Sequence, residues 1–388
     1  MSIWINEVAH IENTQKILDQ YMMANPGIQM GLIQQPWNGY HDKLIALVAG
    51  GVAPDVMVLS RLYVPSFATN GIIQPIDQWL AKDAIDVARD ISEMNSGTWD
   101  GHRYGIPIMG GPGIVLVNED LFQTMGLPTP IEYARNRDWT WDRVIELGKK
   151  ITRDVDGDGR LDVFALPQPG TNAWDWYGKI RVFGGEVIRN NRAVIDSPEA
   201  QRGLELFRDV SLTHHIAPQP GDSANFERGT QALRYAWTSE APNIAKRVDG
   251  AFPVDLVTMP TGPAGAFHVA GGCPVTVSAT TAYPEEAYKF AVWFAMDSDF
   301  WKLLGIPASM NVIRREYRSY LAEFFKSPDV PIEALMGPTA VEPQTHLHSS
   351  ELSGGWNPIL TSLSQGRISP AEAAVQITRH INAVLGAQ

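Results

Sequence analysis

Segments of strand type and helix type alternate through the first ninety residues, and this order constrains the fold more than any other feature of the sequence. Trp4-Ile5 has strand character, and residues 17–22 place apolar side chains at i, i+3 and i+4, the spacing of a helix face. Apolar and polar residues alternate at 28–32, which predicts a second strand, and the apolar residues of 44–48 predict a second helix. The continuous apolar run 56–59 predicts a third strand that is covered on both faces. The order β-α-β-α-β predicts a parallel sheet with right-handed crossovers.

Polar residues that follow two of these strands are the first candidates for a binding site. Asn6, Glu7 and His10 come after the first strand, and Ser60 and Arg61 come after the third. Open α/β sheets bind ligands in the crevice at the carboxyl ends of their strands. We therefore expect these side chains at one edge of the sheet.

Length and charge narrow the class of protein. The chain has 388 residues, which predicts two or three domains, and a net charge of −12 with no basic run. This balance argues against nucleic acid or an anionic membrane as the main partner. No apolar stretch approaches the ~20 residues of a membrane-spanning helix. Cys273 is the single cysteine, which excludes an internal disulfide framework.

Two glycine- and proline-rich segments interrupt the pattern of strands and helices. Residues 109–113 lie between two apolar strand-like runs, and residues 262–265 form a second break. We expect the chain to cross between two lobes at each of them; plain surface loops are the alternative. Helix starts are indicated by Thr140, by Ser197 before Pro198, and by a capping box of Ser369 and Glu372.

Several short motifs are spread over nearly the whole chain. They are Tyr40–Leu44, Ala49–Val56, Gly71–Asp77, Tyr104–Pro107, Asn118–Phe122 with Gly126–Pro128, Thr140–Asp142 and the ending Gly366–Ala374. In this order they are similar to the signature of extracellular solute-binding proteins of ABC importers, family 1, the group typified by the maltose-binding protein.

The resemblance implies an α/β fold of the periplasmic-binding-protein type (type II). Two discontinuous lobes, joined by hinge crossings, then enclose a ligand cleft. With the two breaks and a return near 306–309, lobe 1 is expected at 1–110 and 262–312, and lobe 2 at 111–261 and 313–388. In this family the closed, loaded form is the one that the permease recognises.

The resemblance also implies a function without catalysis. The chain would be the substrate-binding component of an ABC importer, a monomer that closes on a sugar or small oligosaccharide and delivers it to a membrane permease. We expect a periplasmic or extracellular location and a precursor with a signal segment, often with a lipidated cysteine. A carbohydrate-active enzyme, a glycosidase or lyase using the same aromatic cleft, is the alternative, although no sequence motif for nucleophilic or metal-dependent hydrolysis is present. A sensor that signals to a membrane kinase is a third possibility.

Tryptophans carry the sugar hypothesis, because flat aromatic faces suit the C–H face of a sugar ring while polar side chains suit its hydroxyl rim. The sequence has 12 of them. Trp356 and Trp174 or Trp176 are the expected stacking platforms; Trp237 and Asp175 are further candidates in the second lobe. Packing of these tryptophans in the core is the alternative for each. In the first lobe, the candidates are Asn6, Glu7, His10, Trp37, Asn38, Tyr40 and Arg61, with Gly272 as a point of close backbone approach.

Residues 154–162 resemble the first half of a calcium-binding loop. Carboxylates alternate and a glycine follows at the sixth position, a pattern that wraps oxygen atoms around one cation. The twelfth position is Ala165 rather than glutamate, and 163–165 has strand character, so a structural half-motif is expected. Its predicted Ca²⁺ ligands are Asp154, Asp156, Asp158, the Arg160 carbonyl and Asp162, against the alternative of a solvated acidic turn.

Overall fold

The N-terminal alternation forms the predicted parallel sheet. Strands β1 (Ser2–Trp4), β2 (Ile33–Gln35) and β3 (Val56–Val58) are connected by helices α1 (Val8–Ala24) and α2 (Tyr40–Ala49). Both β2 and β3 pair with β1 in parallel. The second strand was expected at residues 28–32, but β2 begins only at Ile33. Ile28, Met30 and Leu32 instead pack beside the core as an irregular segment, because turn bonds such as that from the Ile28 amide to the Asn25 carbonyl occupy the backbone.

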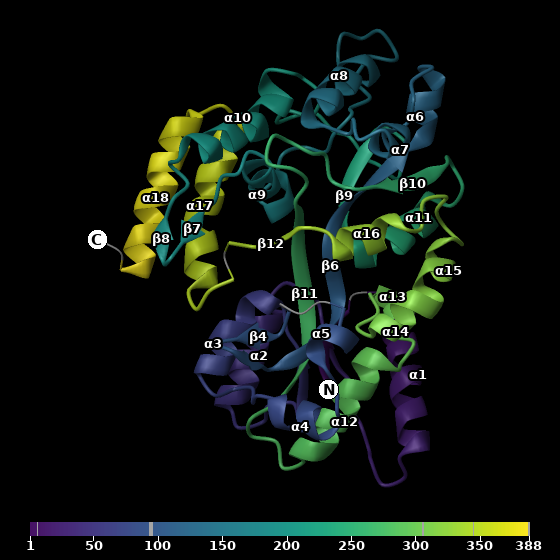
Figure 1. Ribbon diagram of the computed structural model, residues 1–388, viewed down its shortest axis with the longest axis vertical. Helices are drawn as coiled ribbons and strands as arrows, with labels where there is room; N and C mark the ends of the chain where they lie inside the picture. The colour runs from purple at the N-terminus through teal and green to yellow at the C-terminus, as the bar shows by residue number, and fades with distance from the viewer. Residues whose placement is uncertain (6, 93–95, 305, 344, 387–388) are drawn as a thin grey trace. The chain divides into compact units, whose positions relative to one another are not determined.

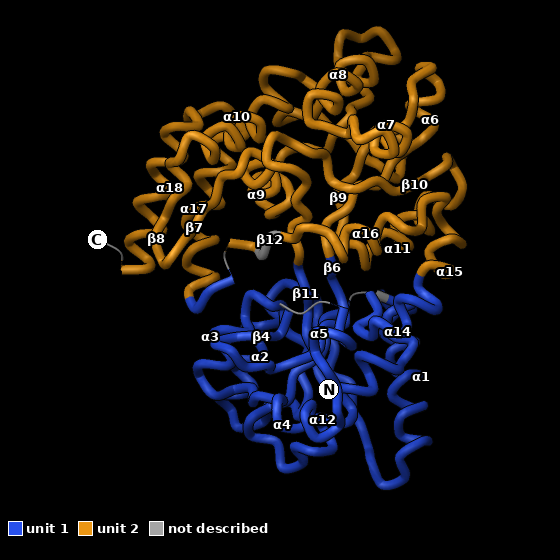
Figure 2. Tube along the Cα trace, viewed as in Figure 1, with its two compact units in different colours: residues 1–111, 271–317, 345–347 blue, residues 112–270, 318–344, 348–388 orange. Residues whose placement is uncertain are grey.

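The computed structural model describes residues 1–388 apart from 6, 93–95, 305, 344 and 387–388. The chain divides into two units, coloured separately in Figure 2. Unit 1 comprises residues 1–111, 271–317 and 345–347. Unit 2 comprises 112–270, 318–344 and 348–388.

Unit 1 completes its sheet with the Val275–Val277 part of β11, which pairs antiparallel with β3. Its core includes Ile3, Leu18, Val58, Phe290 and Phe294. The remaining elements are η1 (Arg61–Tyr63), α3 (Val64–Thr69), α4 (Asp77–Lys82), α5 (Val87–Asp90), β4 (Thr98–Trp99), β5 (His102–Arg103), α12 (Pro284–Met296), α13 (Trp301–Leu304), α14 (Met310–Val312) and the π-helical turn η3 (Ile313–Tyr317).

Unit 2 is built around the second half of β6 (Gly105–Asn118). Strands β9 (Leu233–Trp237) and β10 (Val254–Val257) flank it in antiparallel pairing. Its other elements are α6 (Glu119–Thr124), α7 (Pro130–Arg135), α8 (Trp141–Ile151), α9 (Ala173–Arg181), β7 (Ile188–Arg189), β8 (Arg192–Ala193), α10 (Pro198–Leu212), η2 (Thr238–Glu240), α11 (Ala241–Val248), α15 (Arg318–Leu321), α16 (Val330–Met336), β12 (Thr339–Val341), α17 (Ser349–Ser364) and α18 (Pro370–Leu385).

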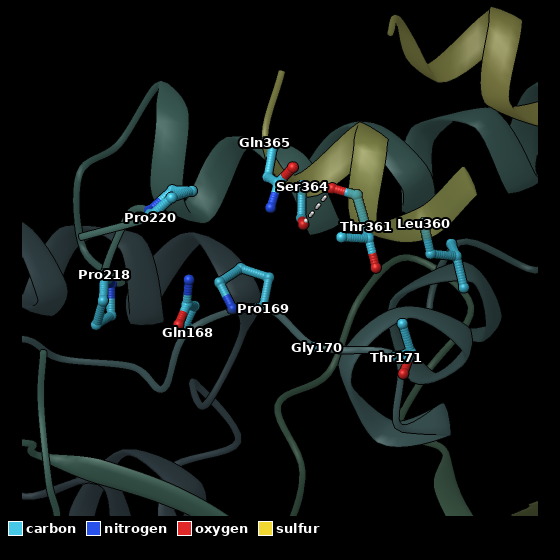
Figure 3. A pocket seen from close by; sticks show the side chains of 10 residues that line it. All are labelled: Gln168, Pro169, Gly170, Thr171, Pro218, Pro220, Leu360, Thr361, Ser364 and Gln365. Atoms are coloured by element: carbon cyan, nitrogen blue, oxygen red, sulfur yellow. Dashed lines mark hydrogen bonds between the residues drawn. The ribbon is translucent and has the colours of Figure 1, made fainter. Parts of the chain in front are cut away.

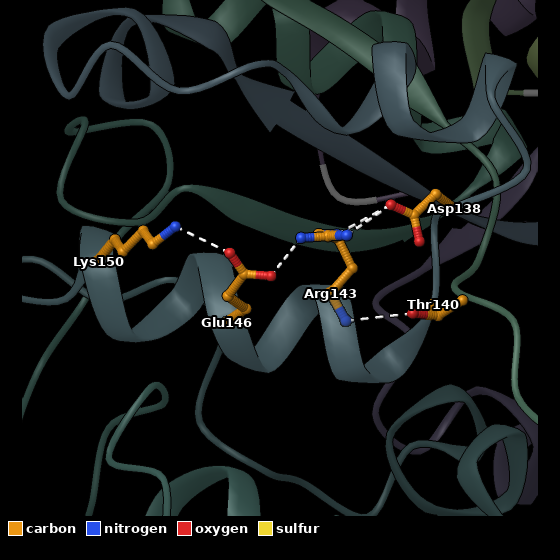
Figure 4. A network of polar contacts seen from close by, with 5 residues as sticks. All are labelled: Asp138, Thr140, Arg143, Glu146 and Lys150. Carbon is orange, nitrogen blue, oxygen red and sulfur yellow. Dashed lines mark hydrogen bonds and ion pairs between the residues drawn. The ribbon is translucent and has the colours of Figure 1, made fainter.

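Among the described residues of unit 2, two hydrophobic clusters are prominent. One lies around α8 and the strands, and the other lies among α9, α10, α17 and α18, which pack side by side (Figure 1). The helix starts predicted from capping residues are confirmed: Thr140, Ser197 and Ser369 each accept a backbone hydrogen bond at a helix N-terminus. In α8, Arg143 then bonds Asp138 and Glu146, and Glu146 also bonds Lys150, which forms a surface network (Figure 4).

Two of the unit boundaries lie inside strands, in β6 and in β11 (His268–Val277), rather than in loops. The segment 109–113, expected as an interruption, is part of one continuous buried strand, β6, and the boundary lies between Gly111 and Pro112. Gly110 has φ +100°, and a Cβ there would overlap the Gly271 carbonyl. The flexibility of glycine is therefore used for close strand contact, which a sequence pattern cannot distinguish from a loop.

The other predicted boundaries are displaced. Residues 262–265 form a turn inside unit 2, closed by hydrogen bonds between Gly262 and Gly265, and the chain crosses at 270–271 within β11 (His268–Val277). Unit 1 extends to Tyr317 rather than 312, and the short return at 345–347 was not expected. No helix among the described residues is long and apolar enough to cross a membrane.

Candidate functional site

Unit 1 carries an aromatic cluster at the carboxyl ends of β1 and β3. Trp4 ends β1, Trp37 precedes α2, Tyr40 and His41 begin α2, and Tyr63 ends η1. The Trp4 ring lies edge-on to Trp37 at 4.9 Å and to Tyr40 at 5.0 Å. His41 stacks on Tyr63 with ring centroids 3.8 Å apart and an interplanar angle of 4°. These rings belong to segments at or after the ends of β1, β2 and β3 and contact one another at that end of the unit 1 sheet.

Exposure in this cluster increases from Tyr40 to Trp37. Tyr40 is buried and its hydroxyl donates to the Val58 carbonyl at 2.8 Å, whereas Trp37 is 44% exposed. The expectation that Tyr40 meets a ligand is corrected by this burial. Its hydroxyl is used inside the unit, and Trp37 offers the open aromatic surface.

The polar candidates of unit 1 differ in accessibility. Glu7 and Asn38 are exposed, and the Glu7 carboxylate lies 3.4 Å from Nδ1 of the half-buried His10. Arg61 and Gly272 are buried, so neither presents an open surface for a ligand, contrary to expectation. Asn6 lies outside the described residues. Trp4, His41 and Tyr63 were not among the predicted site residues. Tyr63 lies two residues after Arg61, so the same signal, a position just after a strand end, could have found it.

Unit 2 has its own pair of partly exposed tryptophans. Trp174 lies in the first turn of α9 and Trp237 ends β9, and their rings meet edge-on at 4.5 Å. The Trp174 ring lies over Gly113 of β6, where a Cβ would lie 3.9 Å from it. The Trp237 amide donates to the exposed carboxylate of Glu240 at 3.2 Å. Two predicted residues thus form one open aromatic surface with an acceptor beside it.

Asp175 and Lys179 form a buried charged pair under this surface. The Lys179 ammonium donates to the Asp175 carbonyl at 2.6 Å and lies over the Trp141 ring at 4.7 Å. Burial raises the pKa of Asp175 to about 6 and lowers the pKa of Lys179 to about 8. Because Asp175 is buried in the interior of unit 2, the expectation that it bonds a ligand directly is corrected.

Trp176 and Trp356 are core residues. Each is 1% exposed, and their rings meet edge-on at 5.5 Å in the cluster of α9, α10, α17 and α18. The Trp176 indole N–H donates to the Thr171 carbonyl at 3.3 Å. Residues 354–358 form part of α17 rather than a loop. The prediction that these two tryptophans are stacking platforms is therefore wrong, because both faces of each ring are covered by packed side chains.

A small pocket of about 110 Å³ lies beside the segment that leads into α9 (Figure 3). Its walls carry no charge. They are Gln168, Pro169, Gly170, Thr171, Pro218, Pro220, Leu360, Thr361, Ser364 and Gln365. Neutral polar and proline side chains of this kind suit an uncharged, hydroxylated molecule.

The acidic loop of unit 2 brings three of its carboxylates together. Asp154, Asp156 and Asp162 each offer an oxygen atom within 4.8 Å of the others. The Asp154 carboxylate accepts from the Gly157 amide at 2.7 Å and the Gly159 amide at 2.8 Å, and these bonds lower its pKa. Asp158 is not in this group; its carboxylate accepts from the Arg160 amide. The loop is a candidate metal site formed by three of the five predicted ligand residues.

Comparisons with known proteins give the same fold. The solved ABC substrate-binding protein of Listeria monocytogenes in complex with cycloalternan has a TM-score of 0.83 at 20% identity, covering 100% of this chain and 98% of that chain. The cyclic alpha-maltosyl-1,6-maltose binding protein of Arthrobacter globiformis has a TM-score of 0.80 at 19% identity, covering 100% and 99%. The two-lobed periplasmic-binding-protein fold predicted from the motifs is thereby confirmed.

Sequence comparison identifies relatives and a family. The maltotriose-binding protein of Pyrococcus abyssi is 20% identical over 340 residues, which cover 84% of this chain and 68% of that protein. The family model for the bacterial extracellular solute-binding protein matches residues 8–297. Since this match includes well over half of the 388 residues, the chain belongs to the family of bacterial extracellular solute-binding proteins.

Proposed function

We propose that this protein is the substrate-binding component of an ABC importer for a neutral oligosaccharide. The observation that carries the proposal is that each unit has a partly exposed tryptophan held edge-on by other rings: Trp37 in unit 1, and Trp174 with Trp237 in unit 2. The names of relatives support the substrate class, since they describe maltotriose, arabinooligosaccharide and cycloalternan as ligands.

The chemistry of the two surfaces fits a sugar. An indole face packs against the C–H face of a pyranose, and neighbouring carboxylate and amide groups accept and donate to hydroxyls. Asn38, which follows Trp37 in the sequence, supplies such a group in unit 1, and Glu240 supplies one beside Trp237. The protein acts outside the cytoplasm and passes the sugar, chemically unchanged, to a permease.

Titration calorimetry tests this proposal. Maltotriose, a cyclic glucan and an arabino-oligosaccharide are titrated separately into the protein, with amino acids as the comparison class. We expect saturable binding of at least one glycan, and a loss of about tenfold or more in affinity for Trp174→Ala, because a stacked aromatic contact is removed. Trp79→Phe, which alters a ring stacked on Tyr288 in the core of unit 1, is the matched control and is expected to bind normally.

The same samples distinguish a carrier from an enzyme. After incubation with excess protein, the glycan is expected to be recovered intact. New reducing ends that increase with time would support the carbohydrate-active enzyme instead. Failure of every glycan to bind would contradict the proposed substrate class.

We propose in addition that the 154–162 loop binds one Ca²⁺ as a structural ion. Ca²⁺ takes six to eight oxygen ligands at about 2.3–2.6 Å. Asp154, Asp156 and Asp162 would hold it, with the Arg160 carbonyl as a further ligand. An ion that binds only the folded chain raises the melting temperature.

Thermal unfolding in calcium and in excess EGTA tests the ion. We expect a higher midpoint with calcium, and no such difference for Asp162→Asn. Asp142→Asn, an exposed carboxylate on α8, is the control that keeps the response. An identical midpoint in both buffers for the unaltered protein would remove the proposal.

A further inference from the structure

His41 lies at the centre of the unit 1 aromatic cluster. Its ring stacks on Tyr63 at 3.8 Å and meets Tyr40 at 5.0 Å, Trp37 at 5.4 Å and Trp4 at 5.6 Å. It is the one ring in this cluster that contacts all four others among the described residues. Removing it would therefore remove one support from each of them.

The His41 ring is also held by a backbone hydrogen bond. Nε2 accepts from the Ser60 amide at 3.1 Å, so the ring proton of the neutral imidazole resides on Nδ1. Burial lowers the pKa of His41 to about 3, which keeps the ring neutral. Ser60 begins the turn that carries Tyr63, since it is the N-cap of η1. One side chain therefore connects the first turn of α2 to the segment after β3.

His41 itself does not reach a ligand. It is 4% exposed, whereas Trp37 is 44% exposed. Trp37 precedes α2 on a short segment that includes Gly39 at φ +79°. Its ring orientation is therefore set by its neighbours, of which Trp4 and His41 both meet it edge-on.

We propose that His41 is a positioning residue for sugar binding: it holds Trp37 and Tyr63 in the orientation in which Trp37 stacks on a pyranose. This rests on the proposed function. The ring has two separate structural roles. Its plane supports Trp37 and Tyr63, and its Nε2 satisfies the Ser60 amide.

Two substitutions separate these features. His41→Phe keeps an aromatic plane but leaves a buried amide unsatisfied, which costs stability. His41→Gln keeps an acceptor that reaches the Ser60 amide but removes the plane. We expect His41→Gln to bind the sugar about tenfold more weakly, because Trp37 and Tyr63 both lose the ring that holds their orientation. His41→Phe is expected to melt at a lower temperature. At temperatures below its melting midpoint, its affinity for the sugar is expected to lie within about twofold of that of the unaltered protein.

A double-mutant cycle with Trp37→Ala shows whether His41 acts through Trp37. The probe is whichever glycan binds in the titrations above. If His41 acts through Trp37, the double variant Trp37→Ala/His41→Gln binds no more than about twofold more weakly than Trp37→Ala alone, because the two effects are not additive. Normal affinity of His41→Gln, or fully additive losses, would overturn the proposal while leaving sugar binding in place.

The role of His41 can also be tested without any ligand, by measuring the orientation of the aromatic rings in the free protein. The near-ultraviolet circular dichroism of coupled rings reports their orientation. The band lost in Trp37→Ala is expected to be lost in His41→Gln and retained in His41→Phe. If no glycan binds, the proposed function fails, and an unchanged band in His41→Gln would separately refute the role of His41.

Discussion

Asp175 shows how far one residue's role depends on its surroundings. The sequence places it between Trp174 and Trp176, where a carboxylate beside aromatic rings suggests a sugar ligand. In the structure it is buried beside Lys179 in the interior of unit 2. Removing one partner of a buried pair of this kind strongly destabilises the folded protein, because the remaining buried charge then has no opposite charge beside it.

The raised pKa of Asp175 predicts a pH-dependent stability. Its pKa rises from the usual 3.8 to about 6, so the folded chain binds more protons than the unfolded chain between these values. The contribution of this group to the free energy of unfolding therefore falls as the pH rises from about 4 to about 6, by about 3 kcal/mol at most. Urea unfolding across this range measures the difference between the unaltered protein and Asp175→Asn. The free energy of unfolding of the unaltered protein minus that of Asp175→Asn is expected to fall as the pH rises, whereas the same difference for the exposed Asp142→Asn is expected not to change with pH. A pH-independent difference for Asp175→Asn would contradict the raised pKa.

At the level of elements, the packing of α9 on α10 positions the unit 2 aromatic surface. Trp174 lies at the start of α9, and α9 lies against α10 so closely that glycine is required at the contact. A Cβ at Gly203 of α10 would lie 2.6 Å from the backbone nitrogen of Ile180. By contrast, a Cβ at Gly178 of α9 would meet its nearest neighbour, Val269, at 3.8 Å, an ordinary contact.

These two glycines make a matched pair of substitutions. Gly203→Ala is expected to lower the free energy of unfolding by about 3 kcal/mol, since the two helix backbones must separate. Gly178→Ala is expected to be neutral or to stabilise by up to about 1 kcal/mol, because alanine favours the helix. Chemical unfolding measures both, and glycan affinity measured on the folded protein reports whether Trp174 has moved. Equal effects of the two substitutions would show that the α9–α10 contact is looser than described.

At the level of the whole molecule, each unit has its own hydrophobic core. The chain passes between the units inside β6, inside β11, after Tyr317 and on both sides of 345–347. We propose that the units change their arrangement when sugar binds, which requires that the sugar bind one arrangement better than the other.

Small-angle X-ray scattering checks this change. With saturating glycan the radius of gyration is expected to decrease, and the scattering mass is expected to remain that of a monomer of 42.8 kDa. Trp174→Ala, at the same glycan concentration, serves as the comparison because it binds weakly. An unchanged radius for the saturated protein would refute ligand-linked closure.

Local structure and family membership could be predicted from the amino-acid sequence. Capping residues such as Thr140, Ser197 and Ser369 specify helix starts through short-range hydrogen bonds, and the alternation of strand and helix segments predicts the parallel pairing of β1 with β2 and β3. Which aromatic side chains are exposed depends on tertiary packing. Trp356 and Trp37 are chemically alike, but burial depends on what other segments pack against each ring, and those contacts are distant in sequence. For the same reason, glycines 110 and 265 could not be assigned from the sequence, since a positive φ serves a close strand contact and a tight turn equally well.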